Sequence, residues 1–395
     1  MSTLAPAPSL AERFSLVRGD APYRLQRRAG LIPLHGLGLV RRAVFWTLLA
    51  WLPLAVWAAL MRRALPGELA EPLLAHFGVH ARLLFAVPLL ILAEAMLDKP
   101  LGRLLAQFER SGLVVAAEQA RFEAALRAVE RLRDATLPWL VILGLSFAMA
   151  WAADLSDRAH ELQWAADVAQ PSSLGFGGLW YLWVGRPLFL LLVLGWLWRL
   201  ALLSVLLLRL GRLNLALVPT HADRCAGLGF LEKLPMHFAP LALAVGAVLA
   251  SRWAHDAVYH GLALIDLKLQ MMIFVVICVL VLCLPLLALM GPLKRAKTQA
   301  LPRYSALVAR QGRLVHQRWI EGREVDDAPI LSAPELGPVA DTAEVYRSVQ
   351  GMRTSLLGKA AIVPVALAAA LPMVAVLTLQ LPVKQLLQAL LKALV

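Results

Sequence analysis

Seven stretches of the chain are almost continuously apolar, and segments rich in charged residues separate them. About 20 mostly apolar residues are enough for a helix to cross a bilayer. The pattern therefore predicts an all-α fold, a polytopic transmembrane helical bundle of six or seven spans. The number stays open because Pro364 and Pro372 favour a kinked or broken seventh helix. The stretches are Val44 to Met61, Leu83 to Asp98, Leu137 to Ala153, Pro187 to Leu210, Phe238 to Arg252, Leu269 to Gly291 and Ala360 to Leu381.

Lys and Arg residues are distributed unevenly between the connections. Segments 1–43, 99–136, 209–237 and 292–359 hold 7, 7, 4 and 11 of them, 29 in all. Segments 62–82, 154–178, 252–268 and 382–395 hold 3, 1, 2 and 2, which is 8 in all. Basic residues accumulate on the cytoplasmic side of membrane proteins. We therefore expect a bacterial inner-membrane protein with a cytoplasmic N-terminus, and seven spans would place the C-terminus outside.

Composition excludes other classes of protein. Hydrophobic residues make up 60% of the 395 residues, and the mean hydropathy is +0.68, too apolar for a soluble fold. The net charge of +13 could suggest nucleic-acid binding, but the basic residues follow the membrane topology and form no basic and aromatic stripe. Cys225, Cys278 and Cys283 are too few for a disulfide framework, so we expect reduced thiols. The polar, basic N-terminus predicts no cleavable signal peptide.

The spans divide the chain into parts of different character. Helical spacing of apolar residues over 302–322 and 339–356 predicts amphipathic cytoplasmic helices, packed under the membrane part on each other or on a neighbouring subunit. A homo-oligomer in the lipid bilayer is therefore expected. The parts are a basic N-terminal segment 1–43, a first transmembrane hairpin 44–98, a cytoplasmic helical connection 99–136, central transmembrane helices 137–291, a cytoplasmic helical segment 292–359, and a last span with an interfacial amphipathic tail 360–395.

Two opposite charges are predicted at the same depth in the bilayer. Arg199 lies twelve residues past Pro187, about 18 Å into the membrane, and Glu94 lies eleven residues past Leu83, about 16 Å in the same direction. A charge at this depth is costly unless it is paired or hydrated. We expect Glu94 and Arg199 to pair, either to fix helix packing or to form a gate, a substrate site or a proton site.

A polar cluster lies near the predicted outer end of the fifth span, at Arg252, His255, Asp256 and His260. Neighbours one helical turn apart can pair with each other. His, Asp and His also suit zinc, but the two histidines lie on different faces of a helix and no further ligand is suitably spaced. We therefore interpret the cluster as hydrated interfacial polarity and expect neither a metal nor a cofactor.

The connection after the fourth span is dense in side-chain donors, acceptors and glycines. His221, Asp223 and Arg224 could bind a phosphate or a lipid headgroup, or they could belong to a tightly turned, capped loop. The run has neither the lysine of a P-loop nor a serine nucleophile. Its candidate residues are Thr220, His221, Asp223, Arg224, Gly227 and Gly229.

This run, Thr220-His221-x-Asp223-Arg224 followed by Gly227-Leu228-Gly229-Phe230, resembles the signature of an uncharacterised family of bacterial polytopic inner-membrane proteins. Family members often carry proline where this chain has Ala222 and glycine where it has Ala226. The resemblance extends over most of the membrane part and includes 258–261. It implies membrane location and no particular chemistry.

Three functions remain compatible with these features. The first is a channel or transporter for a small solute or ion, with an anion preferred because the cytoplasmic vestibule would be basic. The second is a membrane assembly or sensory scaffold that binds partners through its cytoplasmic helices. The third is a membrane-embedded enzyme that acts on a lipid headgroup through His221 and Asp223. The sequence favours a protein that is not an enzyme and does not identify the substrate.

Overall fold

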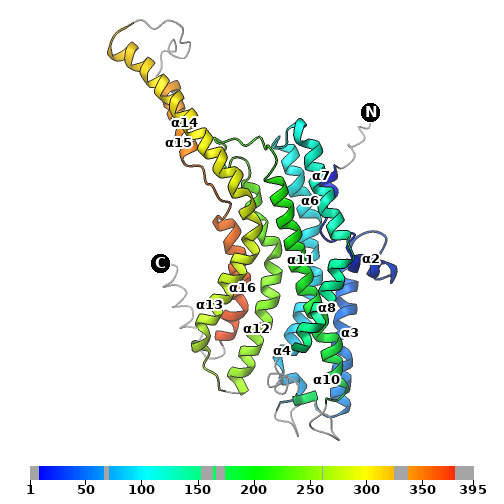
Figure 1. The fold of residues 1–395 in the computed structure, drawn as a ribbon. Coiled ribbons are helices and arrows are strands. Elements are labelled where there is room, and N and C mark those ends of the chain that lie inside the picture. The colour runs from blue at the N-terminus through cyan, green and yellow to red at the C-terminus, as the bar shows by residue number, and fades with distance from the viewer. Residues whose placement is uncertain are drawn as a thin grey trace, which may run out of the picture.

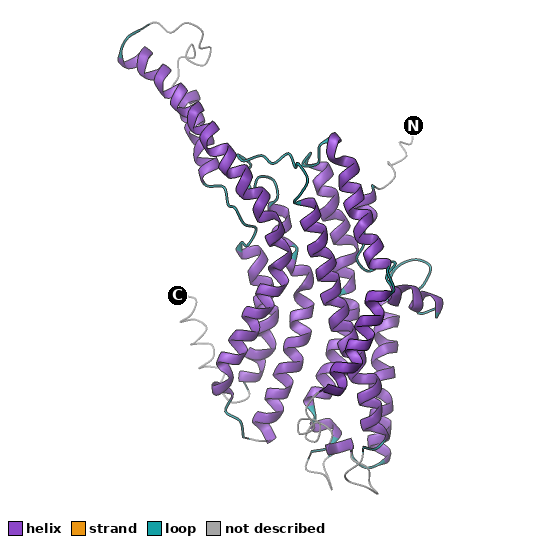
Figure 2. Ribbon diagram, viewed as in Figure 1, coloured by secondary structure: helices purple, strands orange, loops and turns teal. Residues whose placement is uncertain are grey.

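The protein is a bundle of long α-helices, seen in a computed structural model that describes residues 9–65, 71–152, 163–165, 174–259, 261–323 and 337–378. Within these ranges no segment forms a β-strand (Figure 2). Six helices are long and apolar enough to cross a membrane, and a seventh span results if the bent pair Ala116–Asp134 and Leu137–Ala152 is one span. The all-α polytopic fold is confirmed. The six helices are Leu39–Leu60, Phe77–Arg110, Phe176–Leu210, Gly229–Tyr259, Lys268–Ile320 and Lys359–Leu377.

Several of these spans combine shorter elements. The span Phe77–Arg110 contains a π-helical turn and a break at Ala93, and Lys268–Ile320 joins α13, a 3-10 turn, α14 and a π-helical turn. The α-helices are α1 Leu10–Arg13, α2 Ala21–Arg28, α3 Leu39–Leu60, α4 Phe77–His80, α5 Val87–Leu92, α6 Glu94–Arg110, α7 Gln119–Asp134, α8 Leu137–Ala152, α10 Phe176–Trp180, α11 Arg186–Leu210, α12 Ala239–Tyr259, α13 Lys268–Cys283, α14 Met290–Val315, α15 Gly337–Gln350 and α16 Lys359–Leu377. The 3-10 and π-helical turns are η1 Leu73–Ala75, η2 Ala81–Ala86, η3 Ala116–Glu118, η4 Gln163–Ala165, η5 Tyr181–Gly185, η6 Gly229–Lys233, η7 Pro235–Phe238, η8 Leu264–Leu267, η9 Leu284–Leu289 and η10 His316–Ile320.

The helix ends differ from the apolar stretches in a consistent way. The second and fifth apolar stretches, Leu83 to Asp98 and Phe238 to Arg252, are shorter than the about 20 residues that a span needs. The helices that contain them run on through polar residues to Arg110 and to Tyr259. The last helix, α16, runs without interruption through Pro364 and Pro372, so the expected break is absent between Lys359 and Leu377. The amphipathic tail predicted after residue 382 lies outside the described residues.

The helices pack around α11, which contacts α7, α8 and η9. On one side α3 packs on α5 and α10, and on the other side α12 and α13 pack on α16 (Figure 1). The turn between α6 and α7 and the loop 211–228 after α11 lie at one end of the bundle (Figure 1), which we call the basic end after the Lys and Arg residues of these connections. The opposite end, with α4 and α10, we call the far end.

Helix α14 projects beyond the basic end, and α15 packs along it (Figure 1). The two helices predicted from residues 302–322 and 339–356 therefore pack on each other. They extend away from the bundle rather than lying beneath it, because α14 continues the axis of the preceding span into the basic end.

The N-terminal segment crosses the bundle surface and is bound to α6. Arg18 Nη2 lies 2.7 Å from Asp98 Oδ2, and Ser15 Oγ donates to Asp98 Oδ1 at 2.7 Å. Gly102 of α6 faces this segment so closely that an added Cβ would lie 2.6 Å from the carbonyl oxygen of Glu12. This anchoring places Asp20 beside the membrane helices.

We predict that Gly102→Ala lowers the free energy of unfolding by about 1–3 kcal/mol, because the added methyl group overlaps backbone that has little room to move. Gly144→Ala in α8 is the matched control, since a Cβ there meets no atom within 4 Å. Alanine also has the higher helix propensity, so the control is expected to be neutral or stabilising. Denaturant titration in mixed micelles measures both, and equal effects of the two changes would disprove the close packing.

Candidate functional site

Four charged side chains meet inside the bundle, at Asp20, Arg42, Glu94 and Arg199. Arg199 Nη2 lies 2.9 Å from Glu94 Oε1 and 3.2 Å from Asp20 Oδ2. Arg42 Nη1 lies 2.5 Å from the other carboxylate oxygen of Glu94. All four are at most 5% exposed. The structure thus brings Glu94 and Arg199 into contact, as the matching depths predicted, and adds two partners that the sequence did not indicate.

The local structure of each segment places these groups. Asp20 accepts a hydrogen bond from the Tyr23 N–H and so caps α2 while its other oxygen faces Arg199. Glu94 begins α6 directly after the break at Ala93. The indole N–H of Trp196 donates to the Leu90 carbonyl at 3.1 Å, which ties α11 to the chain just before that break.

Arg42 also contacts Gln26, a residue outside the quartet. Its Nε donates to Gln26 Oε1 at 2.8 Å, and the indole N–H of Trp46 donates to the same oxygen at 3.0 Å. The two arginines and two carboxylates balance formally, so the quartet buries no net charge. Each of these buried charges needs its partner, because a buried charge without a partner destabilises the fold.

A cavity of about 550 Å³ reaches three members of this quartet, Arg42, Glu94 and Arg199. Apolar and aromatic side chains of α8, η5 and α11 line most of it, while α2 contributes Arg24 and Arg28 beside Arg42 and Arg199. It runs along α11 from Pro187 to Arg199, a rise of about 18 Å. The cavity borders the outer surface of α8, where Leu140 is 58% exposed.

Two buried donors that line this cavity have no hydrogen-bond partner among the described residues: Arg199 Nε and Trp139 Nε1. Buried donors in proteins almost always have a partner. Trp139 packs so closely against Gly195 of α11 that a Cβ there would lie 3.0 Å from the ring. This packing holds the Trp139 ring in place, and both Trp139 and Arg199 lie at the wall of the cavity.

The loop after α11 serves mainly as a structural element. The Asp223 carboxylate accepts hydrogen bonds from the backbone N–H groups of Cys225, Gly227 and Gly229, at 2.7, 3.2 and 2.7 Å. Gly227 has φ of +92°, and a Cβ on Gly229 would lie 2.9 Å from Asp223. The glycines thus permit the tight turn around the carboxylate.

The remaining loop residues point to the same role. His221 Nδ1 lies 2.9 Å from Asp223 Oδ1, while Thr220 is half-buried and Arg224 is exposed. The Arg224 carbonyl accepts a hydrogen bond from the Arg353 N–H at 2.7 Å, and Arg353 pairs with Glu232 at 2.6 Å. The loop therefore fastens the segment before α16 to the start of the span Gly229–Tyr259.

Two pKa values agree with a structural loop. Burial alone would raise the pKa of Asp223, but the backbone hydrogen bonds and His221 outweigh it and hold that pKa below its ordinary value. Burial raises the pKa of the Cys225 thiol to about 11, so this cysteine stays protonated and unreactive at neutral pH.

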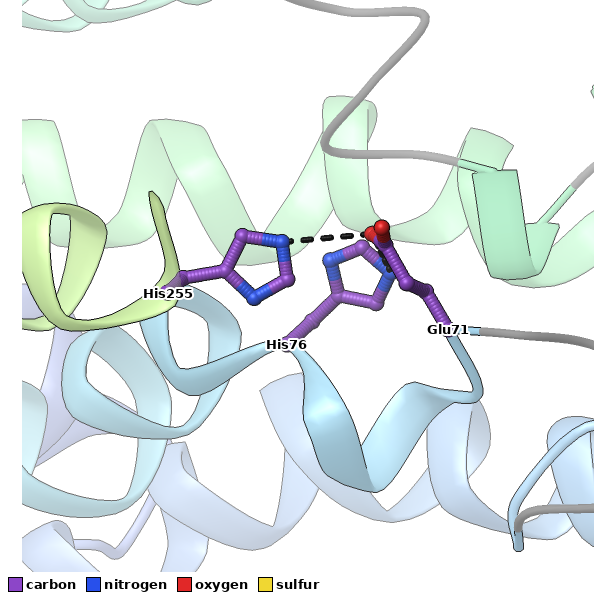
Figure 3. Close-up of side chains that lie close together, drawn as sticks. All are labelled: Glu71, His76 and His255. Atoms are coloured by element: carbon purple, nitrogen blue, oxygen red, sulfur yellow. Dashed lines mark hydrogen bonds and ion pairs between the residues drawn. The ribbon is translucent and has the colours of Figure 1, made fainter. Parts of the chain in front are cut away.

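The polar residues at the far end are arranged differently from the local pattern. His255 contacts Glu71 and lies against His76 (Figure 3), and both of these residues are far from His255 in the sequence. Arg252 lies about one turn before His255 on α12 and Asp256 directly follows His255, whereas His260 lies outside the described residues. Sequence spacing alone missed Glu71 and His76, because no local pattern connects them to α12.

No protein-family model, no curated protein and no solved structure matches the chain. The site is therefore interpreted from its own geometry.

We predict that Glu94→Gln and Arg199→Gln each destabilise the protein by about 3–5 kcal/mol, because each leaves a buried charge without its partner. Together they should cost less than the sum of the two, with a coupling of about 1–3 kcal/mol. Titration with sodium dodecyl sulfate in mixed micelles measures the four stabilities. The exposed pair Glu344 and Arg347 is the control and should show no coupling above about 0.5 kcal/mol. Strict additivity at Glu94 and Arg199 would rule out a direct interaction.

We predict that Asp223→Asn destabilises the protein at pH 7, because an amide is a weaker acceptor than a carboxylate for the three N–H groups. The folded pKa lies below the unfolded one, so the carboxylate contributes its full stability above about pH 5 and loses it as the pH falls below about 3.9. The gap in melting temperature between the two proteins should therefore shrink in acid. Asp341→Asn, at an exposed position, is the control, and a gap that is constant from pH 7 to pH 3 would contradict this role.

Proposed function

We propose that this integral membrane protein is a transporter whose substrate site is the cavity beside Arg199, and that its substrate is an anion with an apolar body. The observation that carries this proposal is a cavity lined by Arg199 and Trp139, two residues that each hold a buried N–H group without a partner among the described residues. Ionisable groups inside a membrane commonly mark substrate pathways. A cavity that reaches Glu94 and Arg199 is what a transport function requires of this fold.

The charge of the cavity favours an anion. Its lining includes four arginines and one carboxylate, Glu94, a formal balance of +3. The positive groups gather at the end next to α2, and the remaining length of the cavity is apolar and aromatic. A ligand with a charged head and an apolar body matches both parts.

The contacts also suggest how binding could move the protein. The anion would accept hydrogen bonds from Arg199 and compete with Asp20, which lies 3.2 Å from Arg199 Nη2. Asp20 caps α2, and α2 forms one wall of the cavity. Release of Asp20 would free this wall, so that substrate binding and opening are coupled through a single ion pair.

A second candidate function, a membrane scaffold, is favoured by the projecting helices α14 and α15. Trp319 and Ile320 at the tip of this arm are 53% and 73% exposed, which is typical of a surface that binds another protein or another copy of the chain. An enzyme acting through His221 and Asp223 has less support, because the Asp223 carboxylate is already engaged by three backbone groups. The excess of Lys and Arg supports a bacterial inner membrane with the basic end in the cytoplasm.

The proposal is tested in liposomes that contain the purified protein and one of two probes. Fluorescent phosphatidylglycerol, bleached by external dithionite, reports transbilayer movement of an anionic lipid, and 4-methylumbelliferyl phosphate reports uptake of a soluble aryl anion. We expect movement of one probe above protein-free liposomes. Arg199→Ala should reduce the rate at least about tenfold, since a charge-assisted contact contributes about 1.5–3 kcal/mol.

Trp139→Phe gives the sharper comparison, because it removes the indole N–H and keeps a smaller aromatic ring near Gly195. We expect it to slow the transported probe several-fold. Trp198→Phe is the matched control, since Trp198 Nε1 is also buried without a partner among the described residues but does not line the cavity. Equal rates for the two tryptophan variants, or no movement of either probe with the wild-type protein, would reject the transport proposal.

A further inference from the structure

Three potential metal ligands converge at the far end of the bundle, well away from the charged quartet. Glu71 precedes η1, His76 directly precedes α4, and His255 comes from α12 (Figure 3). One ligand atom from each lies within 4.8 Å of the other two. His76 is 3% exposed, and the side chains of Glu71 and His255 are 12% and 13% exposed. The three groups thus form a sheltered cluster rather than a solvated surface patch.

The distances approach those of a zinc coordination sphere. His255 Nε2 lies 3.2 Å from Glu71 Oε2, and His76 Nε2 lies 4.0 Å from the same oxygen. Bonds of about 2.0–2.1 Å at tetrahedral angles separate two ligand atoms by roughly 3.3 Å. The edge between His255 and Glu71 is close to this length, and the edge between His76 and Glu71 is longer by less than 1 Å. Two histidines and a glutamate are a ligand set that leaves the fourth position of zinc open.

A backbone contact fixes the orientation of the His255 ring. Its Nδ1 lies 3.1 Å from the Ala75 carbonyl oxygen, which can only accept, so Nδ1 carries the proton. The other ring nitrogen, Nε2, faces Glu71 Oε2 at 3.2 Å, so the nitrogen that would bind a metal ion points toward the carboxylate. Metal-binding histidines characteristically donate their second ring N–H to a carbonyl in this way.

Stacking restrains the other histidine. The rings of His76 and His255 lie 5.0 Å apart at 24° to each other, and Phe77 meets His255 edge to face at 6.2 Å. The two histidines are therefore held in register by aromatic packing before any ion binds. Such preorganisation lowers the cost of assembling a site from separate segments.

We propose that Glu71, His76 and His255 bind a divalent transition metal of the zinc type, with a water molecule or an external donor in the fourth position. The ion would join segment 71–76 to α12 at the far end of the bundle. This site is independent of the cavity at Arg199 and of the function proposed for it.

The test is zinc binding by the full-length protein, purified through a tag without histidines and equilibrated with zinc in detergent. We expect one tightly bound zinc per chain by elemental analysis. His76→Ala and His255→Ala should each weaken binding by more than about 100-fold, beyond the 10–100-fold loss typical of a supporting contact. Glu71→Gln should also weaken it. His35→Ala, at an exposed histidine, is the matched control and should bind as the wild type does.

A spectroscopic measurement on the unaltered chain complements the variants. Cobalt bound in place of zinc should give the visible absorption bands of a four- or five-coordinate site, and X-ray absorption of the zinc form should show two imidazole ligands. Retention of stoichiometric zinc by the His76→Ala, His255→Ala double variant would overturn the assignment. An octahedral cobalt spectrum, or wild-type binding no tighter than that of this double variant, would overturn it as well.

Discussion

The fold depends on keeping four buried charges paired inside an apolar bundle of helices. Asp20, Arg42, Glu94 and Arg199 come from four segments, and among the described residues none of them forms an ion pair outside the quartet. In a low-dielectric interior the loss of one partner costs more than the pair contributes. The quartet therefore fixes the positions of α3, α6 and α11 relative to each other and draws the N-terminal segment into the membrane body.

The sequence predicted half of this quartet. Glu94 and Arg199 stand out because each interrupts an apolar stretch, and helix rise places them at one depth. Arg42 and Asp20 gave no such signal, since both lie before the first apolar stretch, where basic and acidic residues are expected in water. Only the packing of residues 9–20 against α6 shows that this segment leaves solvent, and such long-range contacts have no local pattern.

The other two candidate sites show two different limits of local sequence patterns. The run from Thr220 to Gly229 looked rich in chemistry, but its donors and acceptors mostly satisfy the backbone of a tight turn. At the far end, by contrast, spacing along α12 indicated ordinary polarity. Glu71, which contacts His255, lies 184 residues away from it in the sequence. Periodicity reports which face of a helix a residue occupies, and it carries no information on which distant segment packs there.

The span Lys268–Ile320 is 53 residues long and is continuous from the far end to the tip of the α14 arm. At 1.5 Å per residue it measures about 80 Å, against roughly 30 Å for the hydrocarbon core of a bilayer. About 50 Å of it therefore extends past the lipid as a rigid lever. A tilt of about 10° within the membrane would displace the tip by roughly 9 Å, so a small rearrangement among the buried helices becomes a large movement in the surrounding solution.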